Sequence, residues 1–123
     1  MTLAYWMVLA AAVLPYLCVA LAKWRKNYDN HAPRTGIDAL DPRRQRAYWA
    51  HLNAFEAFAP FAAAIIIAHL CGAPQRAIDG LALTFVAARL AHLFCYWHDY
   101  ATARSVAWTV GFGCVIALFV IAA

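Results

Sequence analysis

Four long apolar segments, separated by polar ones, organise the 123-residue chain. They run from Leu3 to Ala22, Ala47 to Cys71, Ala77 to Trp97 and Ser105 to Ala122. Each approaches the ~20 residues with which a helix crosses the ~30 Å hydrocarbon core of a bilayer. Backbone polar groups must pair internally in lipid, so each segment is expected to be a helix. The pattern predicts an all-α fold: a single four-helix transmembrane domain over residues 1–123, with helices at roughly 3–22, 42–71, 77–97 and 103–122.

Composition excludes an ordinary soluble domain. Hydrophobic residues make up 66% of the chain and charged residues only 13%, whereas a soluble domain carries about 25% charged residues. A chain this short cannot hide so much apolar surface from water. Membrane lipids are therefore the expected surroundings. Nucleic acid is not an expected partner, because the basic residues form no recognition motif.

The four cysteines are spread one to each apolar segment, at Cys18, Cys71, Cys95 and Cys114. No two of them form a CxxC pair. This spacing is typical of small apolar packing residues, and it predicts neither a disulfide framework nor a metal site.

Basic residues are concentrated in and around the first loop, at Lys23, Arg25, Lys26, Arg34, Arg43, Arg44 and Arg46. The second loop holds only Arg76 and the third only Arg104. The positive-inside rule places the first and third loops in the cytoplasm and both termini on the opposite side. Because the basic cluster follows the first apolar segment, that segment is expected to be a retained anchor and not a cleaved signal. The small size and alanine-rich segments favour a multi-pass protein of a bacterial inner membrane.

The second helix has a clear predicted start. Asp41 can cap it, and Pro42 suits the first helical position. Arg43, Arg44 and Arg46 then occupy the first turns, where the helix dipole disfavours cations. Two interpretations are open: the charges only fix the topology, or an anionic ligand or lipid headgroup balances them.

Polar residues form one stripe on the second helix. Trp49, Asn53, Glu56 and Pro60 are spaced 4, 3 and 4 apart, and Arg46 falls on the same face. On the third helix Arg89, His92 and Tyr96 make a similar stripe. The helical rise places Glu56 and Arg89 at similar depths, and an isolated charge there is costly. We therefore expect these two charges to pair.

The pair has two interpretations. It is either a structural ion pair, with Asn53 as an interhelical hydrogen bonder, or the floor of a polar cavity open to the cytoplasm. The cavity is favoured because further polar residues gather at the expected cytoplasmic mouth: Arg46, Asn53, His92, Tyr96, Tyr100 and Arg104. His51 is expected to point away from the stripe, since it lies two residues before Asn53 on a helix.

The motifs NAFEAFAPF (53–61) and RLAHLFCY (89–96), with a later arginine before the fourth helix, resemble the MAPEG family, the membrane-associated proteins in eicosanoid and glutathione metabolism. The resemblance covers nearly the whole chain and implies a homotrimer that binds glutathione as co-substrate between subunits. It implies that Asn53 and Glu56 hold the peptide, and that Arg89 and Tyr96 belong to the same site. Arg104 is then the catalytic candidate that stabilises the thiolate. The expected substrate-binding residues are Arg46, Asn53, Glu56, Arg89, His92, Tyr96 and Tyr100.

The resemblance implies a glutathione transferase or peroxidase acting on a lipophilic small molecule. An alternative is a non-catalytic lipid-binding or accessory subunit of a larger membrane complex. Two residues favour the alternative: Trp49 stands where glutathione-using members often carry arginine, and His92 stands where tyrosine is common.

Overall fold

Four α-helices form the molecule: α1 (Leu3–Lys23), α2 (Pro42–Leu70), α3 (Gln75–His98) and α4 (Ala101–Ala122). The structure is a computed structural model and describes residues 1–24, 29 and 31–123. The expected helix bounds lie within two residues of these. The predicted loop charges Arg25 and Lys26 lie outside the described residues.

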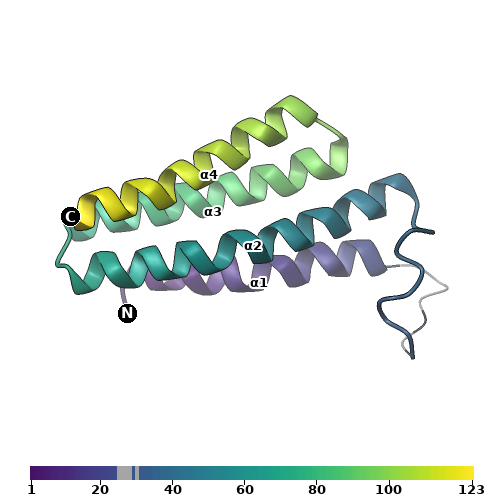
Figure 1. Ribbon diagram of the computed structural model, residues 1–123, viewed down its shortest axis with the longest axis horizontal. Coiled ribbons are helices and arrows are strands. Elements are labelled where there is room, and N and C mark those ends of the chain that lie inside the picture. Colours follow the sequence, from purple (N-terminus) through teal and green to yellow (C-terminus); the bar gives the residue numbers. More distant parts are fainter. Residues whose placement is uncertain (25–28, 30) are drawn as a thin grey trace.

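The helices are arranged as two antiparallel pairs, α1 with α2 and α3 with α4 (Figure 1). Both termini lie at one end of the bundle, which we call the terminal end. At the other end α1 stops, α2 begins, and α3 turns into α4; we call it the long-loop end. All four helices are long and apolar enough to cross a membrane, with mean hydropathies of 1.5 to 2.2 over their spans. The prediction of an all-α, four-helix membrane bundle is confirmed.

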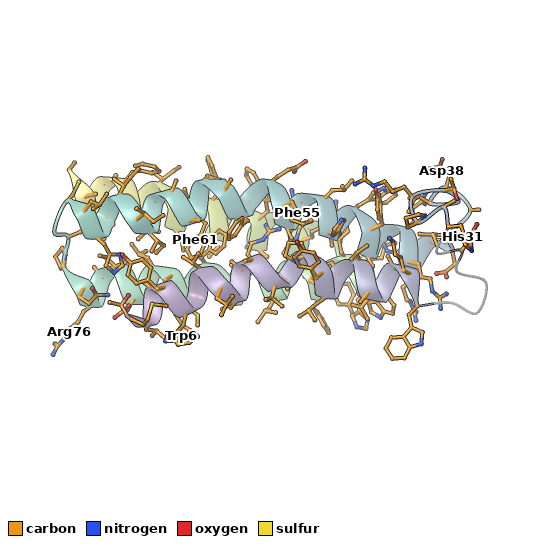
Figure 2. The ribbon with its side chains drawn as sticks, turned by 90° about the horizontal axis from the view of Figure 1, so that it is seen from below. Trp6, His31, Asp38, Phe55, Phe61 and Arg76 are labelled. Atoms are coloured by element: carbon orange, nitrogen blue, oxygen red, sulfur yellow. The ribbon has the colours of Figure 1, made fainter. Side chains whose placement is uncertain are left out.

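Aromatic stacking joins the two helix pairs near the middle of the bundle. Phe61 of α2 and Phe85 of α3 are fully buried, and their rings stack with centroids 3.8 Å apart and an interplanar angle of 5°. Figure 2 shows Phe61 pointing into the space between the helices. Alanines at the helix contacts, including Ala64, Ala68 and Ala82, let the backbones approach closely, which is how membrane helices gain packing energy.

At the terminal end, α3 supplies the cap that α1 lacks. Thr2 precedes α1 and makes no side-chain cap bond. Instead the Asp79 carboxylate accepts a hydrogen bond of 2.8 Å from the backbone N–H of Ala4. An acceptor with negative charge at a helix N-terminus satisfies an unpaired donor and complements the dipole. This contact fixes the start of α1 against α3.

The start of α2 agrees with the sequence. Pro42 is the first helical residue, and the Asp41 carboxylate accepts hydrogen bonds from the backbone N–H groups of Arg43 and Arg44. The Arg44 guanidinium also pairs with Asp41, and this hydrogen bond and charge hold the pKa of Asp41 below its usual range. The predicted cap at Asp41 and first residue at Pro42 are confirmed.

The lowered pKa of Asp41 gives a pH-dependent stability. A carboxyl whose folded-state pKa is depressed stabilises the fold above its unfolded pKa, and that stabilisation is lost as the pH falls through the folded value. Asp41→Ala should therefore lower the melting temperature at neutral pH, and the deficit relative to the wild type should shrink in acid below the usual aspartate pKa of 3.8. Thermal unfolding in detergent across pH measures this.

Asp41→Asn is the matched variant, because asparagine caps helices well but carries no charge. It should unfold at an intermediate temperature at neutral pH. A deficit in Asp41→Ala that stays constant down to strongly acidic pH would contradict the ionic contribution.

Candidate functional site

The site is organised around Arg89, which comes from α3 and is only 4% exposed. Its Nη2 donates a hydrogen bond of 2.7 Å to the Asn53 side-chain oxygen on α2, while its Nε has no partner among the described residues. Gly111 of α4 packs against the arginine, since a Cβ built on Gly111 would lie 3.6 Å from Arg89 Cδ, at van der Waals contact. Residues of three helices thus enclose one buried cation.

Asn53 links Arg89 to Glu56. Its amide nitrogen donates a hydrogen bond of 3.2 Å to Glu56 Oε2, while its oxygen accepts from the guanidinium. Among the described residues no ion pair joins Glu56 to Arg89 directly, so the expected direct pairing is wrong. The two side chains line the same pocket, but the shorter asparagine, one turn earlier on α2, bridges them.

Two adjoining pockets open between the helix pairs. The deep pocket has a volume of about 210 Å³. Its polar residues are Asn53, Glu56 and Arg89, and its apolar walls are Ala57, Pro60, Phe85, Trp108, Gly111, Phe112 and Val115. A charged corner beside aromatic and aliphatic walls suits a ligand that is mostly apolar and carries one polar group.

The polar pocket lies nearer the long-loop end and also has a volume of about 210 Å³. It is lined by Asn53, His92, Tyr96, Arg104, Ser105, Trp108 and Thr109. The hydroxyls of Ser105 and Thr109 donate back to helix carbonyls of α4, at 3.2 and 2.9 Å. They therefore present oxygen lone pairs to the pocket, where a bound N–H group could donate to them.

Arg104 is the cation of the polar pocket. Its guanidinium carbon lies 4.6 Å from the centroid of the Tyr96 ring, a cation–π contact. Tyr96 is in turn packed edge-on against His92, with centroids 4.9 Å apart, and His92 is only 3% exposed. The aromatic ring thus orients the guanidinium without neutralising it, so Arg104 can attract an anion.

Six of the eight predicted site residues come together in these pockets: Asn53, Glu56, Arg89, His92, Tyr96 and Arg104. The other two do not line either pocket. Arg46 instead donates to the carbonyl of Tyr96, and Tyr100 lies against His98 with ring centroids 5.8 Å apart.

His51 points away from the stripe, as expected from its spacing. Its Nδ1 donates a hydrogen bond of 2.8 Å to the carbonyl of Pro15 on α1. It also packs edge-on against Phe55, with centroids 5.0 Å apart. His51 therefore fastens α2 to α1 and takes no part in the site.

The arginines that open α2 are balanced by neighbouring helix ends. Arg44 donates two hydrogen bonds, of 3.2 and 2.9 Å, to the carbonyl of Trp24 just after α1. Arg46 donates one of 2.9 Å to the carbonyl of Tyr96 in the last turn of α3. Helix C-termini carry partial negative charge. Because α1 and α3 run antiparallel to α2, their negative ends offset the unfavourable basic start.

The residues of α4 that line the two pockets, which we call the α4 wall, were not predicted from the sequence, apart from Arg104. Trp108 lines both pockets and stacks on Phe112, with centroids 5.3 Å apart. A signal was present, because Arg104, Trp108, Gly111 and Val115 repeat the 4, 3, 4 spacing of the α2 stripe. Only one of these four is charged, so the stripe does not stand out in an apolar segment.

Comparison with known proteins agrees with this architecture. The model of the MAPEG family matches residues 3–123, nearly the entire chain. Neither the search of curated proteins nor that of solved structures gave a match. The four-helix membrane bundle, the polar stripe of α2 and this match lead to one conclusion: the chain belongs to the MAPEG family, and it is a multi-pass membrane protein of the kind that acts in eicosanoid and glutathione metabolism.

Proposed function

We propose that the protein binds glutathione in the polar pocket and acts as a glutathione transferase or peroxidase on a lipophilic electrophile held in the deep pocket. The observation that carries the proposal is the position of Arg104: an oriented, partly exposed guanidinium in a pocket that adjoins an apolar one. The two pockets share Asn53 and Trp108, so ligands in them would be in contact.

The chemistry follows from the thiol of glutathione, which reacts as the thiolate. A nearby cation favours the charged form and lowers the thiol pKa. In conjugation the Arg104-stabilised thiolate attacks an electrophilic carbon, the S–C bond forms, and the leaving group departs with its electron pair. In peroxide reduction the thiolate attacks one peroxide oxygen and the O–O bond breaks. The alkoxide takes a proton, and a second glutathione converts the sulfenic acid to the disulfide and water.

Asn53 and Glu56 supply the polar contacts for the peptide. Asn53 offers its second amide N–H, because the first donates to Glu56 and the amide oxygen accepts from Arg89, and Glu56 is exposed with a free carboxylate oxygen. A carboxylate suits the α-amino group of glutathione, while Arg104 suits its anionic groups. In this proposal the active protein is a homotrimer in which the pockets face a neighbouring subunit.

The orientation in the membrane is part of the proposal. Most described basic residues lie at the long-loop end: Lys23, Arg34, Arg43, Arg44, Arg46 and Arg104. Arg76 lies at the terminal end and points away from the bundle (Figure 2). This asymmetry favours a cytoplasmic long-loop end in a bacterial inner membrane. The polar pocket would then open towards the compartment that holds glutathione.

Calorimetric titration of the purified protein with glutathione tests the binding step. We expect a saturable signal with a Kd in the millimolar range or below. Asn53→Ala should weaken binding by about tenfold, because a hydrogen bond to a charged partner is lost and Arg89 loses its support. Thr84→Ala is the matched control; Thr84 is exposed and donates to the carbonyl of Gly80, outside both pockets. Absence of any heat at millimolar glutathione would contradict the proposal.

A second candidate function is that of a non-catalytic lipid-binding or accessory subunit. Trp49 favours it, because an uncharged indole stands where glutathione-using members often carry arginine. The Trp49 side chain is 46% exposed and lines neither pocket. Glutathione binding without turnover of any lipophilic electrophile would support this candidate over the enzyme.

A further inference from the structure

Arg46 of α2 makes its polar contacts at the C-terminal end of α3. Its Nε donates a hydrogen bond of 2.9 Å to the backbone carbonyl of Tyr96, and its Nη1 lies 3.5 Å from Asp99 Oδ2. The Arg46 side chain is only 18% exposed, so these contacts are shielded, whereas Asp99 is 64% exposed. A guanidinium can bridge two acceptors because its N–H groups form a rigid fork.

The acceptors of Arg46 flank the turn from α3 to α4. Asp99 is the residue after α3 and adopts a left-handed conformation with φ of 63°. The backbone N–H of Tyr100 closes the turn with a hydrogen bond of 2.9 Å to the carbonyl of Cys95. Two residues after Asp99, α4 begins at Ala101. A residue that fixes this turn therefore also fixes the start of α4.

Tyr96 extends the connection to Arg104. Its backbone carbonyl is held by Arg46, and its ring lies under the guanidinium of Arg104 at 4.6 Å. Arg46 itself lines neither pocket. The connection from Arg46 to Arg104 thus runs through Tyr96 and through the α3–α4 turn.

We infer that Arg46 is a positioning residue, which holds the α3–α4 turn against α2 and thereby sets the place of Arg104 in the polar pocket. It acts through Tyr96 and Asp99 and does not contact the ligand. The inference rests on the proposed function where it concerns glutathione, but the hold on the turn is a property of the protein alone. This positioning role differs from one in which Arg46 binds a carboxylate of glutathione directly.

Hydrogen–deuterium exchange of the full-length protein in nanodiscs, without glutathione, tests the hold on the turn. In Arg46→Gln the amides of Asp99 and Tyr100 should exchange about tenfold faster, because a hydrogen bond from a charged donor is lost. Asp99→Asn tolerates the left-handed conformation and should raise exchange only two- to threefold, roughly, since an exposed ion pair is weak. Arg44→Gln is the matched control, because Arg44 contacts Asp41 and Trp24 instead. Its exchange at the α3–α4 turn should equal that of the wild type.

Ultraviolet difference absorbance of bound glutathione tests the consequence for Arg104. At saturating glutathione, Arg46→Gln should bind a smaller fraction as thiolate, and Asp99→Asn should shift that fraction in the same direction. Unchanged exchange in Arg46→Gln would overturn the inference, whether or not glutathione binding weakens. Faster exchange with an unchanged thiolate fraction would overturn the link to Arg104. If exchange is faster in Arg46→Gln but the wild type does not bind glutathione, the proposed function is contradicted, while the role of Arg46 in fixing the turn is supported.

Discussion

Replacing Arg104 with alanine should remove the thiolate absorbance of bound glutathione at neutral pH and lower kcat/KM by about 10²- to 10³-fold, the usual loss for an electrostatic stabiliser of a reacting anion. The physical reason is that no other arginine lines the polar pocket among the described residues. Without the guanidinium, the bound thiol should titrate near the pKa of a free cysteine, about 8.5. Ultraviolet difference spectra across pH and initial rates with a lipophilic electrophile measure both effects.

Two further variants test whether the effect is specific to the guanidinium of Arg104. Arg104→Lys keeps the charge but loses the planar group that lies over Tyr96, so it should retain part of the thiolate signal. Arg76→Ala removes the same charge at the terminal end and should leave spectra and rates unchanged. A full thiolate band in Arg104→Ala would assign the stabilisation to another cation.

Replacing Asn53 with leucine should lower the free energy of unfolding by about 1.5–3 kcal/mol, because the buried guanidinium of Arg89 loses its only side-chain partner among the described residues. A charge left without a hydrogen bond in a low-dielectric interior is strongly unfavourable. Equilibrium unfolding in mixed micelles gives the value. Thr84→Val, at an exposed position on α3, should change it by no more than about 0.5 kcal/mol.

The double variant Asn53→Leu with Arg89→Met separates this explanation from simple loss of packing. With both polar partners replaced by apolar ones, no charge remains unpaired, and the double variant should be more stable than Asn53→Leu alone. Strictly additive losses would show that the Asn53–Arg89 contact does not couple the two positions.

The helices could be predicted from the sequence because lipid imposes a simple rule. A span must be long, apolar and internally hydrogen-bonded, so hydropathy alone located α1 to α4. The Asp41 cap was equally accessible, because it depends on neighbouring residues only. The spacing of Asn53 and Glu56 also predicted their shared face, since helical periodicity is local.

The contacts across helices were harder to predict. Depth matching gave the level of Glu56 and Arg89 along the bundle axis, but not the rotation of the helices or the reach of each side chain. The arginine therefore meets Asn53 in place of Glu56. Arg46 was placed at the mouth of a cavity, yet its guanidinium reaches a backbone carbonyl, an acceptor that no side-chain pattern reveals.

The α4 wall was missed for a related reason. Trp108, Gly111 and Phe112 line the deep pocket, but in a membrane span such residues are compatible with lipid contact as well as with a site. Their role depends on facing Arg89, which is a property of the assembled bundle.

An experimental structure of the protein with bound glutathione tests the central claim most directly. The proposal predicts the sulfur beside Arg104 in the polar pocket, the peptide against Asn53 and Glu56, and Arg46 still on the carbonyl of Tyr96. Glutathione bound elsewhere on the protein, or no glutathione at millimolar concentration, would contradict it.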